Sequence, residues 1–531
     1  MAKTTKDQII KTLWSAADTF RDNIDASNYK DYILSMLFIK YLSDLFKEDV
    51  EKLEKEYEGI RLERQIKNLP FVLENESTFD YLYSNRNQDD IGRKISESLT
   101  SIESSNATLN GIFRSIDFNS EANLGKKDQK NAILRTLLED FAVLDLRPSQ
   151  IETSDNEIPS DIIGDAYEYM IGQFATMAGK KAGSFYTPQE VSEVMAKIVE
   201  PKAGDRIYDP TCGSGSLLIR AAKQSGIKGV QIYGQESNGS AISMARMNMF
   251  LHNIQDAQIK WGDTLANPQF LDSDGNLMKF ECIVANMPFS LDKWAKGFNP
   301  GGEISSDDSK KSKKDTKFEM TAGLDRWHRF DIGVPPQSKG DWAFLLHMIH
   351  SMSSEGRIAA VAPHGVLFRG ASEARIRKAI IDRNLLDAVI GFPENLFYGT
   401  SIPASILIFR KNRGEKKDIL FIDASKKPVT KDGSKNKLEP STINEIVEVY
   451  NFYKDNNYKE ATVDKFSHVA TIDEIEKNEF NLNIPRYVDT FEEEKPIDIK
   501  LVLKEIKKLE KEKEELDLEI DKYLKELGLL D

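Results

Sequence analysis

The sequence predicts a multi-domain protein with an N-terminal α-helical bundle, a doubly wound (Rossmann-like) α/β domain and a C-terminal coiled-coil helix. Three observations carry this prediction. Apolar residues recur at helical spacing over residues 5–150, strand-like and helix-like runs alternate from about residue 150, and the residues after Pro496 repeat apolar side chains in heptads. We therefore assign residues 1–150 to a helical domain, 151–480 to the α/β domain, and 481–531 to a linker and a helix for subunit assembly.

Length and composition agree with several globular domains. The chain has 531 residues, of which 40% are hydrophobic and 30% charged, and its formal net charge is −14. Such a charge repels phosphate, so a nucleic-acid contact needs a local basic surface or a partner. The two cysteines, Cys212 and Cys282, are too few for a disulfide framework. The first residues lack the apolar core of a signal peptide, and Lys40 and Asp44 interrupt the longest apolar stretch. We expect a cytoplasmic chain without a membrane span.

The N-terminal region predicts helices with no chemistry of their own. Its first helix carries apolar residues three or four positions apart, and a longer one follows over residues 29–57. Glycine and proline are scarce before Pro70, and polar stretches such as residues 85–90 are typical of loops between helices.

From about residue 150 the pattern predicts a largely parallel sheet. A helix over 161–175 and a loop over 183–191 precede it. The strand-like runs are Arg206–Asp209, Val230–Glu236, Ala257–Trp261, Phe280–Ala285, Arg357–Pro363, Asp387–Phe392 and Ser405–Arg410, most of them separated by helical segments. A polar, Lys-rich stretch over 297–317 breaks the rhythm, and it fits a lid beside an active site as well as a disordered insertion.

The C-terminal stretch predicts a coiled coil about four heptads long. Charged residues fill most of the other positions, and Lys513 occupies one core position, where a polar residue can fix register or partner. The apolar seam consists of Ile499, Val502, Ile506, Leu509, Leu516, Ile520, Tyr523 and Leu527. A single amphipathic helix folded back on its own domain is the alternative.

A glycine-rich loop follows the first strand, from Asp209 to Ser216. Its two glycines allow a tight turn and a close approach to a ligand at the start of a helix. A dinucleotide-binding loop needs a third glycine where this chain has Leu218, and no phosphate-binding Gly-Lys-Ser/Thr sequence occurs. The loop therefore predicts a nucleoside site without a pyrophosphate contact.

Acidic residues end the first three strands. Glu236, about 20 residues beyond the glycine-rich loop, can accept both ribose hydroxyls in a doubly wound fold. Asp263 is placed to accept from an exocyclic adenine amine. Taken singly, each acid is better explained as a surface or capping residue, but Asp209, Glu236 and Asp263 at successive strand ends indicate a site.

The fourth strand ends in Asn286-Met287-Pro288-Phe289. The Asn286 side-chain oxygen and the Met287 carbonyl can grip the two N–H groups of an aromatic amine and localise its lone pair. Pro288 stiffens the turn, Phe289 can stack on the base, and at Met287 only the backbone carbonyl is needed. No metal or cysteine nucleophile is required.

These motifs resemble those of the amino-methyltransferases that use S-adenosylmethionine. The glycine-loop motif is matched by DPTCGSGSLL (209–218), and the N-P-P-F/Y motif by Asn286-Met287-Pro288-Phe289, with Met287 where the family usually has proline. Over nearly the whole chain the sequence is similar to one branch, the modification (M) subunits of type I restriction-modification systems. Further matches lie at 27–46, 161–175, 183–191 and 391–409, the last as a sheet hairpin.

The resemblance implies a cofactor site. Its members include Ser184, Phe185, Tyr186, Thr187, Pro188 and Gln189 at the methionine end, and Ser214, Gly215, Ser216 and Glu236 elsewhere. Asp209, Gly213 and Asp263, from the loop and the strand ends, complete the set that we expect to bind S-adenosylmethionine.

The resemblance also implies an activity and partners. It implies adenine-N6 methylation of double-stranded DNA, with the adenine flipped out of the duplex. Two M subunits act with one DNA-specificity (S) subunit, and a restriction (R) subunit joins the full complex. About 120 residues follow Arg410, too few for a further target-recognition domain beside the terminal helix, so we expect sequence recognition in another chain.

Other activities compete with this interpretation. N5 methylation of a protein glutamine needs the same two acceptors, although those enzymes are much shorter. A second alternative is a non-catalytic assembly scaffold with a methyltransferase fold. The only observation that favours it is Met287 in place of the usual proline. Cytosine-N4 transfer stays open, whereas cytosine-C5 transfer needs a nucleophilic cysteine, usually after proline, and here Thr211 and Glu281 precede the two cysteines.

Overall fold

The fold is taken from a computed structural model, which describes residues 3–21, 24–114, 116–154, 157–178, 186–226, 229–298, 319–398, 400–433, 435–490, 499–527 and 529. The chain divides into two compact units, Met1–Val488 and Asp489–Asp531. Among the described residues, no helix is long and apolar enough to cross a membrane.

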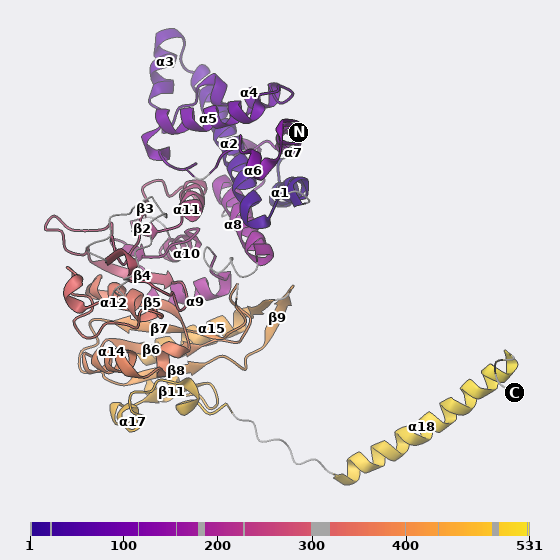
Figure 1. The fold of residues 1–531 in the computed structure, drawn as a ribbon, viewed down its shortest axis with the longest axis vertical. Helices are drawn as coiled ribbons and strands as arrows, with labels where there is room; N and C mark the ends of the chain where they lie inside the picture. The colour runs from indigo at the N-terminus through magenta and orange to yellow at the C-terminus, as the bar shows by residue number, and fades with distance from the viewer. Residues whose placement is uncertain are drawn as a thin grey trace, which may run out of the picture. The chain divides into compact units, whose positions relative to one another are not determined.

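The N-terminal region is helical, as the sequence predicts (Figure 1). Its helices are α1 (Lys6–Arg21), α2 (Ala26–Glu54), α3 (Gly59–Lys67), α4 (Phe79–Ser84), α5 (Ile91–Ser105), α6 (Glu121–Leu124), α7 (Lys127–Ala142) and α8 (Pro159–Ala178). Except for α3, which has no buried residue, they share one apolar core, to which α11 (Gly239–Leu251) of the α/β region also contributes. Phe250 of α11 meets the rings of Phe38 and Phe71 edge-on, at centroid distances of 5.3 and 5.8 Å. The helical region is thus fastened to the α/β region through α8 and α11.

The α/β region is built on a nine-stranded sheet in the order β11-β8-β6-β7-β5-β4-β1-β2-β3. Its strands are β1 (Arg206–Asp209), β2 (Gln231–Glu236), β3 (Gln258–Trp261), β4 (Phe280–Asn286), β5 (Met352–Pro363), β6 (Leu386–Gly391), β7 (Ala404–Arg410), β8 (Ile419–Asp423) and β11 (Ser467–Ala470). The sheet is largely parallel as predicted, but it is mixed, because β7 runs against β5 and β6, and β11 runs against β8. The β6–β7 pair is the hairpin expected at 391–409.

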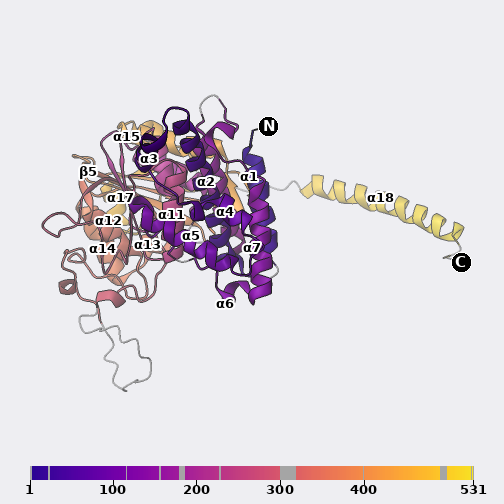
Figure 2. The ribbon, with the colours of Figure 1, turned by 90° about the horizontal axis from the view of Figure 1, so that it is seen from above.

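Helices cover both faces of this sheet, which is the doubly wound arrangement that the alternation predicts (Figure 1). Alternate residues of β1 show it: Ile207 packs in a core with α9 (Gln189–Val199), α10 (Ser216–Gln224) and α15 (Pro440–Lys454), whereas Tyr208 packs in a core with α12 (Asp341–His350) and α14 (Ala371–Asp382). The helical region lies above this α/β region in Figure 1, and in the view from above it lies in front of part of it (Figure 2).

The strands beyond Arg410 were not predicted from the sequence. The short run of β8 continues the sheet in parallel with β6, and β11 closes it. A separate hairpin, β9 (Val429–Asp432) with β10 (Lys435–Leu438), is mostly polar and charged, so it lacks the apolar signal of a buried strand. The remaining helices are α13 (Gly365–Phe368), α16 (Tyr458–Ala461) and α17 (Ile472–Lys477).

The second unit contains the helix α18 (Ile499–Glu526). The predicted helix is therefore present. Its apolar side chains are exposed, with Leu509 at 63%, Leu516 at 58% and Ile520 at 52%. A coiled coil needs a second helix against this seam, so that part of the interpretation stays a prediction. The expected lid or insertion at 297–317 lies almost wholly outside the described residues.

Candidate active site

The sheet order brings three motif-bearing strand ends together. Strands β4, β1 and β2 are parallel neighbours, with Tyr208 beside Ile283 and Asp209 beside Gly234 in register. Their carboxyl ends therefore lie at one edge of the sheet. That edge carries Asn286 at the end of β4, Asp209 at the end of β1 and Glu236 at the end of β2. In open α/β sheets this edge is where ligands bind.

The glycine-rich loop is held by hydrogen bonds to the two strand-end acids. The Thr211 amide donates to Asp209 Oδ1 at 2.8 Å, and the Gly213 amide donates to Glu236 Oε2 at 3.0 Å. Gly213 and Gly215 have φ angles of 53° and 78°, where a side chain is disfavoured. A Cβ on Gly215 would also lie 3.0 Å from Cε of Met249. The loop thus depends on both glycines, and it leads directly into α10.

Burial raises the pKa of both acids, Asp209 and Glu236. Desolvation raises the pKa of Asp209 to about 8, opposed by the amide of Thr211 and assisted by the negative charge of Glu236. Desolvation also raises the pKa of Glu236, although the amides of Asn238 and Gly213 favour its charged form. The site therefore holds carboxyl groups that a hydrogen-bond donor or a cation can stabilise on binding.

We expect Asp209→Asn to stabilise the ligand-free chain at high pH. Because folding raises this pKa from 3.8 to about 8, ionising the buried carboxyl destabilises the fold. The destabilisation grows as pH rises from the unfolded value and is complete above the folded value. Asparagine keeps the acceptor for Thr211, so its melting temperature should exceed that of the wild type clearly at pH 8.5 and little at pH 4.5, by scanning calorimetry. Equal shifts at the two pH values would contradict this.

The side chain of Asn286 is oriented by Thr187. The Asn286 Nδ2 group donates to Thr187 Oγ1 at 3.2 Å, which leaves Oδ1 as the acceptor on the other side of the amide. Phe289 is half-buried and contacts the ring of Phe397 at a centroid distance of 5.9 Å. The side chain of Met287 is buried in the apolar core on one face of the sheet. The view that only its backbone carbonyl matters is therefore incomplete, because this side chain also fills the core.

Two residues that the sequence analysis overlooked hold the turn after Phe289. The Ser290 amide, at a φ of 52°, donates to Oδ1 of the buried Asp341 at 2.6 Å. Arg369 donates to Asp341 Oδ2 at 2.9 Å and so balances the charge of this acid. Asp341 begins α12 and Arg369 follows α13, far along the chain from the motif, so no local pattern could reveal them.

The structure brings seven of the predicted site residues to one cleft. It is lined by Tyr186, Thr187, Asp209, Gly213, Ser214, Ser216 and Asn286, together with Thr211, Cys212 and Leu217. Gly215 and Glu236 adjoin it through the loop, and Pro188 is buried just before α9. Gln189 lines a neighbouring pocket with Tyr186. Ser184 and Phe185 lie outside the described residues.

Asp263 lies apart from this lining. Its side chain is exposed, and its Oδ1 atom accepts from the amides of Leu265 and Ala266 at 2.9 and 3.2 Å. These two hydrogen bonds are those of a capping residue, which is the alternative to a ligand contact that the sequence left open for this acid. The predicted hydrogen bond from an adenine amine would have to go to the Oδ2 atom, and this contact stays a prediction.

The donor and acceptor set of the cleft fits an adenosyl cofactor. Each oxygen of Glu236 accepts backbone amides, from Gly213 and Asn238, and can accept a further hydrogen bond from a ribose hydroxyl. Cys212 is buried, and desolvation followed by the charges of Asp209 and Glu236 raises the pKa of its thiol. The thiol is therefore a poor nucleophile, as expected for a site that needs none.

Comparisons with known proteins identify relatives along the whole chain. A family model described as N-6 DNA methylase matches residues 159–496, and the HsdM N-terminal domain matches residues 9–141. The type I restriction enzyme MpnII methylase subunit of Mycoplasma pneumoniae is 32% identical, covering 98% of this chain and 96% of its own length. The MjaVIII methylase subunit of Methanocaldococcus jannaschii is 33% identical, with 99% and 86% covered.

A solved structure agrees with these relatives. The type I restriction-modification methyltransferase subunit from Streptococcus thermophilus superposes with a TM-score of 0.75 at 35% identity. The match covers 92% of this chain and all of that one.

Proposed function

Because this chain belongs to the N-6 DNA methylase family, as a methylase (M) subunit of the type I restriction-modification kind, we propose that it methylates the N6 amine of a flipped adenine with S-adenosylmethionine as methyl donor. A separate specificity subunit selects the DNA sequence. The methylated DNA is thereby protected from restriction.

The observation that carries this proposal is the position of Asn286. Its side-chain amide lies at the end of β4, in the same cleft as the glycine-rich loop. The Nδ2 atom of this amide donates to Thr187 Oγ1. The Oδ1 atom of Asn286 and the carbonyl of Met287 then accept the two N–H groups of the adenine amine. Two acceptors localise the nitrogen lone pair and disperse the positive charge that develops on the nitrogen during transfer.

The cofactor supplies an electrophilic methyl group when it is bound. Tyr186, Thr187, Asp209 and the loop from Gly213 to Ser216 are the residues that would hold it, since they line the cleft beside Asn286. Glu236 adjoins them and offers its carboxylate to the ribose hydroxyls.

Phe289 gives the flipped adenine a surface on which to stack. An adenine inside a duplex cannot reach the end of β4, so it must leave the base stack. The half-buried ring of Phe289 is fixed by its contact with Phe397, and its accessible part can receive the base. Stacking on an aromatic ring is worth about 1–3 kcal/mol per base.

Thr187→Val should slow methyl transfer about fivefold. Valine has the shape of threonine but removes the hydroxyl that accepts from Asn286 Nδ2, and one lost hydrogen bond of this kind costs about 1 kcal/mol. The affinity for S-adenosylmethionine should be measured alongside, because Thr187 also lines the proposed cofactor cleft. Thr187→Ser keeps the hydroxyl and should restore the rate. A wild-type rate in the valine variant would exclude this role.

The partners that we propose are DNA, one specificity subunit, a second copy of this chain and, in the full complex, a restriction subunit. The net charge of −14 supports an assembly in which another chain supplies most of the DNA contacts. The exposed seam of α18 supports a helical contact with such a partner.

The proposal is tested by acceptor choice. The purified chain, alone and with its specificity subunit, is titrated with S-adenosylmethionine by calorimetry, and radiolabelled methyl transfer is then measured to duplex DNA and to protein. We expect saturable binding and labelled DNA. Labelling of protein glutamine instead would favour the alternative of a protein methyltransferase, and failure to bind the cofactor in either form would favour a scaffold.

A further inference from the structure

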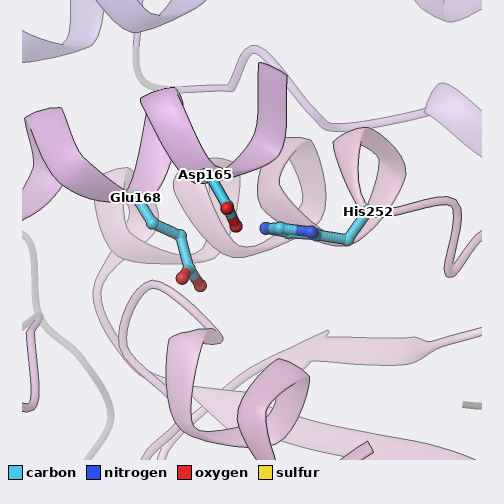
Figure 3. Close-up of side chains that lie close together, drawn as sticks. All are labelled: Asp165, Glu168 and His252. Carbon is cyan, nitrogen blue, oxygen red and sulfur yellow. The ribbon is translucent and has the colours of Figure 1, made fainter. Parts of the chain in front are cut away.

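Helices α8 and α11 meet in a polar contact that the proposed reaction does not use. Figure 3 shows Asp165 and Glu168 of α8 facing His252, the residue that follows α11. The imidazole is buried, and its Nδ1 atom bonds to Asp161 Oδ1 at 3.1 Å. Gly164 makes this contact possible, because a Cβ there would lie 2.6 Å from the ring. The ring therefore presses directly against the backbone of α8.

A cation site is the first interpretation that such a cluster invites. One ligand atom from each of Asp165, Glu168 and His252 can be chosen so that the three lie within 4.8 Å of one another. However, Lys6 and Lys223 contact the two carboxylate oxygens of Asp165 at 3.1 and 3.4 Å. Their ammonium groups already provide the positive charge that a metal ion would bring. We therefore interpret the cluster as a polar anchor that joins α8 to the residue after α11.

The anchor places Asn248 against the glycine-rich loop. Asn248 precedes His252 by one helical turn, so both side chains lie on the same face of α11. Its Nδ2 group donates to the carbonyl of Ser214 at 3.1 Å and to Glu168 Oε1 at 3.3 Å, and lies 3.4 Å from Ser216 Oγ. Asn248 is completely buried, where such bonds are costly to lose.

The partners of Asn248 fix its orientation. A main-chain carbonyl and a carboxylate can only accept, so the amide must present Nδ2 to them. Its Oδ1 atom is buried and has no partner among the described residues. Turning the amide over would set Oδ1 against the oxygens of Ser214 and Glu168. The side chain thus sits in one orientation, although one of its own atoms is left unsatisfied.

We propose that Asn248 is a positioning residue for cofactor binding and that Glu168 holds it in place. Asn248 fixes the carbonyl of Ser214, and hence the backbone between the two positive-φ glycines, Gly213 and Gly215. Glu168 lies on α8, which shares its apolar core with α1 and α2. The shape of the cofactor loop therefore depends on the seating of the helical region. This inference rests on the proposed function, because it takes the loop as the S-adenosylmethionine site.

The test measures cofactor affinity in the full-length chain with its specificity subunit. Asn248→Ala should raise the Kd for S-adenosylmethionine about tenfold, as expected for one buried hydrogen bond. Asn248→Asp should raise it further, because a carboxylate would face the oxygens of Ser214 and Glu168. Glu168→Ala should raise the Kd about threefold to tenfold, whereas Glu168→Gln keeps an acceptor and should restore most of the affinity. The transfer rate at saturating cofactor should change less than the Kd.

Tyr167→Phe is the matched control. It removes another buried hydrogen bond between the same helices, from the Tyr167 hydroxyl to the carbonyl of Met244 at 3.4 Å, without reaching the loop. It should lower the melting temperature and leave the Kd unchanged. The inference would be overturned if Asn248→Ala left the Kd unchanged. It would also be overturned if the Kd rose in proportion to the loss of stability in every variant, the control included.

The outcomes separate this inference from the proposed function. If the wild-type complex does not bind S-adenosylmethionine, the proposed function fails. If it binds and the variants bind equally well, only the positioning role fails. Should Asn248→Ala not fold, Glu168→Ala carries the test, because Glu168 is only half-buried and its substitution spares the core.

Discussion

Asn286→Ala is expected to reduce methyl transfer to DNA about a thousandfold, while S-adenosylmethionine binds with nearly the wild-type affinity. Alanine removes the Oδ1 atom that we propose as an acceptor for the adenine amine. It also releases Thr187 from its hydrogen bond, but it leaves Glu236 and the glycine-rich loop in place. Single-turnover transfer and cofactor calorimetry separate the two effects. Loss of the rate without loss of affinity is the signature of a group that acts on the substrate amine.

Two further variants sharpen this result. Asn444→Ala makes the same truncation on the exposed face of α15 and should leave the rate unchanged. Phe289→Ala should slow transfer strongly by removing the stacking surface, whereas Phe289→Trp retains an aromatic face and should recover part of the rate. A wild-type rate in Asn286→Ala would exclude the proposed mechanism.

Removal of residues 497–531 should abolish assembly with the specificity subunit while the rest of the chain stays folded. The contact pattern supports this, because Met1–Val488 forms a compact unit without α18. The seam of α18 exposes apolar side chains that bury their surface only against another helix. Co-purification and sedimentation of the mixed subunits measure the loss. Unchanged assembly would contradict the proposed role of this helix.

A pair of point variants tests the seam itself. Ile520 lies on the heptad seam and is 52% exposed, whereas Leu518, 70% exposed, lies two residues away and off the seam. Ile520→Lys should weaken assembly by about 2–5 kcal/mol, which is the cost of leaving a charge buried and unpaired in an interface. Leu518→Lys should leave assembly nearly unchanged. Equal effects of the two variants would indicate that no specific seam is used.

The sequence predicted the elements that carry local signals. The buried runs of β1 and β4 and the positive-φ glycines between Asp209 and Ser216 were found because burial and tight turns restrict residue type. The same reasoning placed Asn286 beside the glycine-rich loop, since parallel strands end at one edge of the sheet.

The sequence could not predict contacts that depend on distant segments. Asp341 and Arg369, which hold the turn after Phe289, come from separate elements of the chain. Nothing in the sequence distinguishes Asn248 from the other residues of its buried helix, because its role depends on contacts with Ser214 and Glu168. The reversed direction of β7 was expected only from the resemblance, as a hairpin, because a fully buried strand has the same apolar run in either direction.

The central claim is that Asn286 and its neighbours present an adenine amine for methylation. It is tested most directly by nucleoside mass spectrometry of duplex DNA after incubation with S-adenosylmethionine and the complex of this chain with its specificity subunit. We predict N6-methyladenine with the wild-type chain and none above background with Asn286→Ala. Modification as N4-methylcytosine, or N6-methyladenine at equal levels with the two chains, would contradict the account.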